Sequence, residues 1–431
     1  MNNSTVAVTD AAALAAAPAG FYQRHVLHAL GRMSAGCLRL ELPDGTSRVI
    51  GTPGSEISAT LRIRHEAFFQ KVILFGDVGF GESYVDGDWD TDSIERVIAW
   101  AIHNLDNTPA LSGSKLRSFT LNILRAWNRS LHLLRPNSRT TARRNIAEHY
   151  DLGNDFYRIW LDPTMTYSSA LFSAPDQPLE DAQHAKYEAL CRQLRLQPHD
   201  HVLEIGSGWG GFACHAARHH GCRVTTVTIS QQQYDHARER IAREGLSDRI
   251  DLRLQDYRDI RGTFDKVASI EMMEALGDRY LETFFAKIHE VLAPHGLVAL
   301  QYITVPDSRH AQLRRGVDWI QKHIFPGSLL LSLGRVNAAL QRTGDLFLHR
   351  LDDLGLDYAR TLREWHRVFN DRIDDVRALG FDDRFVRKWN YYLQYCEAAF
   401  AMRNITVVHA TYTRPNNPLL RGSTCPVPAR P

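Results

Sequence analysis

A short apolar strand, a glycine-rich turn and a second strand follow one another between His201 and Gln233, and this order most constrains how the chain can fold. The apolar run Val202–Ile205 leads into a turn that holds four glycines between positions 206 and 211. A helix-like segment then connects the turn to a β-branched run, Val224–Ile229. This order is typical of the first half of a doubly wound, nucleotide-binding sheet. Glycines are needed in the turn because a Cβ would keep its backbone away from a ligand.

The glycine spacing alone admits two kinds of nucleotide site. Gly206, Gly208 and Gly211 have the spacing of a dinucleotide fingerprint, which predicts a nicotinamide cofactor if an acidic residue ends the second strand. That strand instead ends in Thr228–Ser230, without a carboxylate. Glu204 inside the first strand, followed by this loop, fits S-adenosylmethionine (SAM) methyltransferases better. We therefore favour a methyltransferase over a dehydrogenase, and over a glycine turn that binds nothing.

Apolar strands and helical segments alternate through the rest of this region, which we place at residues 144–413. Strands are expected at Ile250–Leu254, Lys266–Ile270, Leu297–Val305 and Ile405–Thr413, and helices at Tyr280–Leu292, Thr361–Phe369 and Phe385–Met402. Residues 308–356 are expected to form helices and loops that wall a pocket. The alternation predicts an α/β domain with a mostly parallel sheet covered on both faces.

A smaller α+β domain is predicted for residues 21–105. Alternating leucines at 38, 40 and 42 before a Pro-Asp-Gly sequence predict a strand and a turn. The glycine-rich stretch 76–90 is predicted to be a turn-rich loop, because its acidic residues lack the spacing of a calcium-binding EF-hand. Residues 1–20 and 414–431 are predicted to be a disordered leader and a disordered tail.

Residues 106–143 are predicted to form a basic amphipathic helix that links the two domains. Between positions 107 and 147 the chain has eight lysines and arginines and no acidic residue. Apolar residues recur there at three- and four-residue steps, at Leu116, Phe119, Ile123, Trp127, Leu131 and Leu134. Such a helix suits an interfacial membrane contact with anionic head groups. A linker helix that docks on the second domain is an equal alternative, whereas nucleic-acid binding is disfavoured because no recognised module accompanies the charge.

The cysteines and the hydropathy limit where the chain can work. Six cysteines are scattered without CxxC or paired spacing, which favours a reducing compartment over a disulfide framework. No apolar run reaches the ~18 to 20 residues of a membrane span, and the first residues lack the basic region of a signal peptide. We therefore expect a cytoplasmic protein that associates peripherally with the inner face of the membrane.

A group of histidines and cysteines after the glycine turn raises the question of a metal site. His215 and His219 share a helix face, and Cys214 and Cys222 are close to them in the sequence. No second ligand pair with metal spacing is evident. We therefore predict no metal and assign these residues to the core or the surface.

Several ordered blocks resemble the cyclopropane-fatty-acyl-phospholipid synthases and mycolic acid methyltransferases. The segment RNIAEHYDLGNDFYRIWLDPTMTYSSALF (144–172) carries the resemblance most clearly. The family pattern continues in GDVGFGESYVDGDWD (76–90), VLEIGSGWGG (202–211), TISQQQ (228–233), SIEMMEALG (269–277), DWIQKHIFPG (318–327), DYARTLREW (357–365) and YYLQYCEAAF (391–400). The resemblance thus covers nearly the whole chain, from residue 21 to residue 413.

The resemblance implies a class I SAM-methyltransferase sheet, Rossmann-like and doubly wound, with a smaller N-terminal α+β lipid-binding domain. It implies SAM as the methyl donor, an unsaturated acyl chain of a membrane phospholipid as the acceptor, and a cyclopropane fatty acid as the product. It also suggests a homodimer. Three alternatives stay open: a methyl- or methylene-branched product, a soluble amine or phenol as the acceptor, and a lipid-binding protein without activity.

The resemblance assigns eight residues to SAM, namely Tyr167, Ser168, Gly206, Gly208, Thr228, Gln233, Asp256 and Tyr257. The glycines would approach its amino acid portion, Thr228 and Gln233 would flank the ribose, and Asp256 with Tyr257 would lie near the adenine. The residues support part of this independently. Thr228 and Gln233 stand at a strand end, where their polar side chains can replace the missing carboxylate. Asp256 follows the third strand, at the edge where such sheets bind ligands.

The resemblance also implies a bound bicarbonate as the base that removes a proton after methyl transfer. Its ligands would be Ser169, Glu274, Gln301, Ile303 and Tyr358. The family has a cysteine at the first of these positions and a histidine at the third. Serine and glutamine can still donate hydrogen bonds to an anion. Glu274, just after the fourth strand, is our principal catalytic candidate.

Cys396 matches a position that is sometimes assigned as the family's active-site cysteine. Methyl transfer to an alkene requires no thiolate, and YYLQYCEAAF has the spacing of a buried helix face. We therefore favour a packing role for Cys396. The reaction needs protection from water for the carbocation that methyl transfer leaves on the acyl chain, and aromatic faces can stabilise such a cation.

Overall fold

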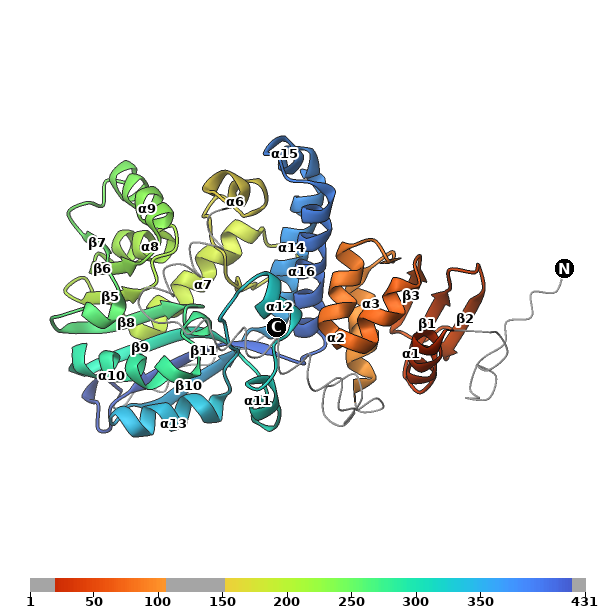
Figure 1. Cartoon of the computed structure of the whole chain (residues 1–431). Helices are drawn as coiled ribbons and strands as arrows, with labels where there is room; N and C mark the ends of the chain where they lie inside the picture. Colours follow the sequence, from red (N-terminus) through yellow and green to blue (C-terminus); the bar gives the residue numbers. More distant parts are fainter. Residues whose placement is uncertain (1–19, 106–151, 421–431) are drawn as a thin grey trace.

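Two β-sheets, one of four strands and one of seven, organise residues 20–105 and 152–420, which the computed structural model describes (Figure 1). Residues 1–19 of the predicted leader, the predicted linker helix at 106–143, and residues 144–151 and 421–431 lie outside the described residues. Along the described ranges, no helix has the length and hydropathy needed to cross a membrane.

The seven-stranded sheet has the strand order β10-β11-β9-β8-β5-β6-β7. Its strands are β5 (His201–Ile205), β6 (Arg223–Thr228), β7 (Ile250–Leu254), β8 (Phe264–Ile270), β9 (Leu292–Thr304), β10 (Phe347–Asp353) and β11 (Thr406–Thr413). The strands from β7 to β9 are parallel, whereas β11 runs antiparallel to both of its neighbours. The chain builds outward from β5 through β6 and β7, and then places β8 on the other side of β5. The carboxyl ends of β5 and β8 therefore flank a topological switch point, where such sheets bind ligands.

Helices cover both faces of this sheet, which confirms the predicted α/β class. They are α7 (Leu179–Leu194), α8 (Gly211–His220), α9 (Gln231–Arg243), α10 (Leu281–Val291) and α13 (Leu333–Thr343). One buried cluster contains Val202 of β5 with Leu190 of α7 and Phe212 of α8. Another contains Leu203 of β5 with Phe284 of α10. Successive residues of one strand thus serve opposite faces, as the pleat of a strand requires.

The four-stranded sheet belongs to the N-terminal region and has the order β2-β1-β3-β4. Its strands are β1 (Cys37–Glu41), β2 (Ser47–Gly51), β3 (Ser58–Ile63) and β4 (Trp89–Asp90), and its helices are α1 (Phe21–Gly31), α2 (Ala67–Val85) and α3 (Ile94–His103). The alternating leucines lie on β1 and on the residue after it, and β1 pairs antiparallel with β2 across the predicted turn.

A layer of helices joins the two sheets (Figure 1). Its members are α6 (Asn154–Trp160), α12 (Trp319–His323), α14 (Gly355–Asp371), α15 (Ile373–Ala378) and α16 (Asp383–Ala401). Helix α11 (Asp307–Leu313) contacts α13, and the 3-10 turns η3 (Tyr257–Asp259), η4 (Met273–Ala275), η5 (Asp278–Tyr280) and η6 (Pro418–Leu420) lie elsewhere. Helix α16 packs against α14 and also against α2 and α3. One hydrophobic cluster contains Phe68 and Trp100 of the N-terminal region together with Trp160, Trp365 and Trp389. The two regions are therefore held together by a shared core.

The prediction of a turn-rich loop at 76–90 is wrong, because most of this stretch is helical. Helix α2 continues after a break at Gly76, whose φ of 60° and ψ of −130° are not helical. Gly79 and Gly81, in the later part of α2, serve close packing. A Cβ on Gly81 would lie 2.6 Å from Trp319 Nε1 on α12 and 2.8 Å from Tyr391 Cε1 on α16. Local composition could not show this, because the aromatic neighbours are far away in the sequence.

Two further predictions need correction. Residues 308–356, expected to form mainly helices and loops, also contain the edge strand β10, whose mostly exposed side chains lack the alternating pattern of a half-buried strand. Residues 414–420, expected to belong to a disordered tail, are packed against the sheet region. The buried Asn417 side chain there donates a hydrogen bond to the His295 carbonyl at 3.0 Å.

Candidate active site

A cavity of about 1220 Å³ lies at the carboxyl edge of the large sheet. The glycine turn, the ends of β6 and β8, and residues of α2, α11, α12 and α16 line it. Its wall includes all eight residues predicted to contact SAM and four of the six catalytic candidates, namely Glu274, Ile303, Tyr358 and Cys396. The other two candidates, Ser169 and Gln301, do not line the cavity but donate hydrogen bonds to the wall residue Glu271.

The glycine turn presents its backbone to this cavity. Gly206 and Gly208 have φ angles of 96° and 49°, which residues with side chains rarely adopt. A Cβ on Gly208 would meet no described atom within 4 Å, so a side chain there would extend into open space. A Cβ on Gly206 would approach Met272 Cγ at 3.2 Å. The turn therefore leaves the room that the amino acid portion of SAM needs.

Polar groups follow at the ends of β6 and β7. Thr228 Oγ1 donates to Gln233 Oε1 at 3.0 Å, and both side chains are buried. Asp256 accepts hydrogen bonds of 2.8 and 2.7 Å from the Arg258 guanidinium. The Tyr257 hydroxyl is buried without a hydrogen-bond partner among the described residues, and burial raises its pKa to about 12. An orphaned buried hydroxyl calls for a partner, so this wall fits the ribose and adenine of SAM.

The carboxylate of Glu271 stands among the predicted catalytic residues. Its Oε1 accepts hydrogen bonds from the Ser169 backbone N–H at 2.8 Å and from Gln301 Nε2 at 2.6 Å. Its Oε2 accepts one from the Tyr358 hydroxyl at 2.9 Å. Three of the five residues expected to hold bicarbonate thus bond to a carboxylate of the chain itself.

Sequence reasoning missed the part that Glu271 plays in this network. One signal was present, because Glu271 comes directly after β8 at the carboxyl edge of the sheet. The structure adds a φ of 46°, which is uncommon for a residue with a side chain. Such strained backbone is concentrated at functional sites. The three donors come from separate elements, so no local pattern could have assembled them.

Glu274 lies near Glu271 but is bonded differently. Its Oε1 accepts a hydrogen bond from the Ile303 backbone N–H at 2.5 Å. Its Oε2 is buried and has no hydrogen-bond partner within residues 20–105 and 152–420. Burial, with a smaller effect of Glu271, raises the pKa of Glu274 to about 8. Glu274 is therefore protonated at neutral pH and can donate a hydrogen bond from its unengaged oxygen.

A buried lysine connects the catalytic carboxylates to the SAM side of the cavity. Lys186 is 0% exposed, and its Nζ donates to Ser168 Oγ at 2.7 Å. Burial lowers the pKa of Lys186 to about 7, and the attraction of Glu271 opposes that shift. Burial also raises the pKa of Glu271. Ser168, Lys186 and Glu271 thus belong to one electrostatic network.

Aromatic rings surround Tyr167, the remaining residue predicted to contact SAM. Its ring centroid lies 5.4 Å from that of Trp365 and 5.5 Å from that of Tyr157, and its hydroxyl lies 2.8 Å from that of Tyr392. The rest of the cavity wall has a largely apolar part, with Leu74, Phe75, Val78, Leu329, Ala399 and Phe400. A wall of this extent suits an acyl chain better than a small polar molecule.

Cys396 lies on α16, at the wall of the same cavity. Burial raises the pKa of its thiol, so the sulfur is protonated at neutral pH. A thiol in this state is a weak nucleophile. The geometry thus supports the packing role favoured from the sequence.

This chain is similar to known proteins that are named for the modification of fatty acids and mycolic acids. Residues 137–410 match the mycolic acid cyclopropane synthetase family. The tuberculostearic acid methyltransferase of Mycobacterium tuberculosis is 38% identical over 391 residues, which is 88% of each protein. The cyclopropane-fatty-acyl-phospholipid synthase of Escherichia coli is 33% identical over 403 residues, 89% of this chain and 97% of that protein. A solved mycolic acid cyclopropane synthase, in complex with SAH and CTAB, is 28% identical with a TM-score of 0.59, covering 63% of this chain and 98% of its own.

Proposed function

We propose a substrate and a mechanism for this chain, which belongs to the mycolic acid cyclopropane synthetase family and is a SAM-dependent methyltransferase that modifies lipids. The acceptor is the double bond of an unsaturated acyl chain in a membrane phospholipid, and the product is a cyclopropane fatty acid. The observation that carries the mechanism is the Glu271 carboxylate, which three predicted catalytic residues hold in place.

The cavity can protect the cation that this reaction creates. Bound SAM supplies an electrophilic methyl group. The acyl double bond would form a bond to that methyl carbon while the methyl–sulfur bond breaks and its electron pair stays on sulfur, which would leave S-adenosylhomocysteine and a carbocation on the acyl chain. Neighbouring aromatic faces such as Tyr167 stabilise a cation by about 1 to 2 kcal/mol per desolvated ring. The largely apolar wall keeps water away from it.

Glu271 completes the reaction as the base. It accepts a proton from the transferred methyl group, and the electron pair of the broken C–H bond closes the three-membered ring. Tyr358 and Gln301 fix the orientation of the carboxylate through their hydrogen bonds. Because Glu274 is protonated at neutral pH, Glu271 and Glu274 together carry a single negative charge.

Glu271 takes the role that the resemblance gives to a bound bicarbonate. A bicarbonate would need the donors of Ser169, Gln301 and Tyr358, which the Glu271 carboxylate engages. The variant Glu271→Gly removes this carboxylate, and glycine suits the positive φ at the position. We expect it to be inactive in bicarbonate-free buffer and to regain activity when bicarbonate is added. The wild-type protein should be indifferent to bicarbonate, and a wild-type enzyme that requires it would contradict the assignment.

A methyl- or methylene-branched acyl chain is the second candidate product. The 38% identity to a tuberculostearic acid methyltransferase favours it. Both products begin with the same methyl transfer. A ring and a methylene branch differ in whether the electron pair of the broken C–H bond forms a ring bond or a carbon–carbon double bond. A saturated methyl branch would also require a separate hydride donor.

Mass spectrometry of lipids tests the acceptor and the product together. Cells that express the chain are grown with labelled methionine, and their phospholipid acyl chains are compared with those of cells that express Glu271→Gln. The proposal expects a labelled gain of one CH2 in the wild type alone, and hydrogenation then separates a ring from a methylene branch. Label in a soluble amine or phenol, with none in lipid, would refute the lipid acceptor.

The phospholipid is proposed to reach the cavity by peripheral contact of the protein with the cytoplasmic face of the membrane. Helix α2 of the N-terminal region lines the cavity, which supports a part for that region in presenting the lipid. At low salt, the protein should co-sediment with vesicles of an unsaturated anionic phospholipid. Light scattering of the purified protein would test the predicted homodimer.

A further inference from the structure

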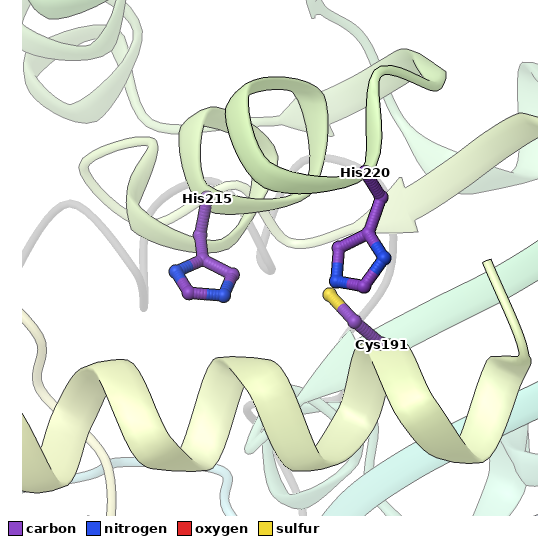
Figure 2. A group of neighbouring side chains, drawn as sticks. All are labelled: Cys191, His215 and His220. Atoms are coloured by element: carbon purple, nitrogen blue, oxygen red, sulfur yellow. The ribbon is translucent and has the colours of Figure 1, made fainter. Parts of the chain in front are cut away.

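A cluster of potential metal ligands lies between α7 and α8, apart from the residues assigned above to the lipid and SAM sites. Helix α7 contributes Glu188 and Cys191, which are three residues apart on one face. Helix α8 contributes His215 and, as its last residue, His220. Figure 2 shows Cys191 reaching up from α7 toward His215 and His220, which reach down from α8.

The donor atoms lie at distances that a metal ion could bridge. One ligand atom each from Cys191, His215 and His220 lie within 4.8 Å of one another. Glu188 Oε2 lies 3.0 Å from His220 Nε2 and 3.4 Å from His215 Nε2. In a tetrahedral zinc site with bonds of about 2.0 to 2.3 Å, ligand atoms are roughly 3.3 to 3.8 Å apart. The ligand atoms of Cys191, His215 and His220 would have to approach one another by at most about 1.5 Å to reach that spacing.

The protein alone satisfies His215 poorly. The 3.4 Å separation between its Nε2 and Glu188 is longer than an ordinary hydrogen bond. Its Nδ1 is buried and has no hydrogen-bond partner in the part of the chain that the structure describes. Its ring stacks on His184 and lies against His219, with centroids 5.8 and 4.5 Å away. A metal ion bound at Nε2 would give that nitrogen the close partner that Glu188 alone does not provide.

We propose that Cys191, His215 and His220, with Glu188 as the fourth ligand, form a structural zinc site that joins α7 to α8. A thiolate, two imidazoles and a carboxylate form a donor set that zinc prefers in tetrahedral geometry. With four protein ligands the coordination sphere is closed, so the ion has no open position for a substrate. Arg192 Nε donates to Glu188 Oε1 at 2.8 Å and leaves Oε2 directed at the histidines.

The sequence analysis considered a metal site of His215, His219, Cys214 and Cys222 and rejected it. The site proposed here keeps only His215 from that set. Cys222 Sγ donates instead to the Ala216 carbonyl at 3.5 Å. The missing ligand pair comes from α7, more than twenty residues earlier in the chain. Two helices distant in sequence had to be packed together before the pattern could be seen.

Zinc would hold together the two helices that support the SAM side of the cavity. Lys186 and Tyr187 directly precede Glu188 on α7. Lys186 donates a hydrogen bond to Ser168, and the Cζ of Tyr187 lies 2.9 Å from the position that a Cβ on Gly211 would take. Gly211 is the first residue of α8, directly after the glycine turn. A clamp between α7 and α8 would therefore stabilise the position of that turn.

Metal analysis of the purified full-length protein tests the site. Protein equilibrated with zinc and then dialysed should retain about one zinc per chain in the wild type, and much less in His220→Gln and Cys191→Ala. The control variants Cys214→Ala and His289→Gln should retain the wild-type amount. Circular dichroism establishes that each variant is folded. Wild-type protein without zinc, or equal zinc in His220→Gln, would overturn the proposal.

Two further measurements do not depend on enzyme activity. Cobalt-loaded wild type should show the thiolate-to-cobalt charge-transfer band, and Cys191→Ala should lose it while Cys214→Ala keeps it. Chelation should lower the melting temperature of the wild type and leave that of folded His220→Gln unchanged. Equal responses of these two proteins to the chelator would count against a structural ion at this place.

Discussion

Gln301 Nε2 lies 2.6 Å from Glu271 Oε1, and this hydrogen bond joins strand β9 to the acidic residue that directly follows its parallel neighbour β8. The other end of the amide is also fixed, because Gln301 Oε1 lies 2.8 Å from His409 Nε2 on β11. Burial lowers the pKa of His409 to about 3, so its imidazole is neutral and donates this hydrogen bond. Side chains from adjacent strands thus orient the Glu271 carboxylate.

Replacing Gln301 by leucine should impair catalysis without weakening SAM binding. The variant keeps a similar side-chain volume but removes a hydrogen bond to a charged group, which is worth about 1.5 to 3 kcal/mol. We expect kcat to fall about 10- to 100-fold. Calorimetry should show an unchanged Kd for SAM. Gln301→His keeps a donor at this position and should retain more activity than Gln301→Leu; the reverse order would contradict the assigned role.

Replacing Lys186 by methionine should move the pH profile of the reaction. The positive charge of Lys186 favours the ionised form of Glu271, so its loss raises the pKa of Glu271 further. The acid limb of kcat/KM against pH should therefore shift to higher pH, by about 1 to 3 units. Lys266→Met is the matched control, because Lys266 is also buried but has Asp200 and Asp265, and not Glu271, as its acidic neighbours. A profile that stays in place in Lys186→Met would remove Lys186 from the network.

The residues that we propose for SAM could be grouped from the sequence because most of them are local. The glycine turn, Thr228 and Gln233 stand within one strand-turn-helix-strand unit, where periodicity and residue type are enough to locate them. The eight predicted SAM residues all line one cavity.

The acceptor side could not be predicted, because it depends on contacts between distant elements. Glu271 becomes a candidate base only when Ser169, Gln301 and Tyr358 converge on it. The glycines of α2 indicate a turn by composition alone. Their use in close packing is visible only with Trp319 and Tyr391 in place.

The stability of the protein should depend on Glu204 and on pH. Glu204 is buried, accepts a hydrogen bond from Thr226 Oγ1 at 2.5 Å, and has a pKa raised to about 8 by burial. Between the unfolded value of 4.5 and 8 the native state holds a proton that the unfolded state has lost. The buried, protonated Glu204 therefore contributes to the free energy of unfolding. Its contribution is complete below pH 4.5 and is lost as the pH rises toward 8, by up to about 1.4 kcal/mol per pH unit. Urea denaturation at several pH values gives the free energy of unfolding as a function of pH. This free energy should fall less steeply with pH in Glu204→Gln than in the wild type, whereas the exposed control Glu56→Gln should keep the wild-type dependence.

Replacing Gly208 by alanine should weaken SAM binding more than it weakens the fold. The new methyl group would extend into the space beside the turn, at a φ of 49° that alanine tolerates poorly. We expect the Kd for SAM to rise at least about tenfold, which is about 1.4 kcal/mol. Gly245→Ala imposes a similar backbone strain, at a φ of 69° and with no described atom within 4 Å, but lies outside the cavity wall. Equal SAM affinities in the two variants would show that the turn does not contact the donor.

Replacing Gly81 by alanine should impair methylene transfer to the lipid without weakening SAM binding. The added methyl group would stand 2.6 Å from Trp319 Nε1 and 2.8 Å from Tyr391 Cε1, so α2 must move away from α12 and α16. Such overpacking costs about 1 to 3 kcal/mol of stability. Helix α2 contributes Leu74, Phe75 and Val78 to the cavity wall, whereas the SAM residues lie on the sheet region. We therefore expect methylene transfer to the acyl chain to fall while the Kd for SAM stays unchanged. Gly20→Ala, with nothing within 4 Å of the added methyl, should behave as wild type. A Gly81→Ala protein that is fully active on lipid would show that the packing of α2 does not shape the acceptor side.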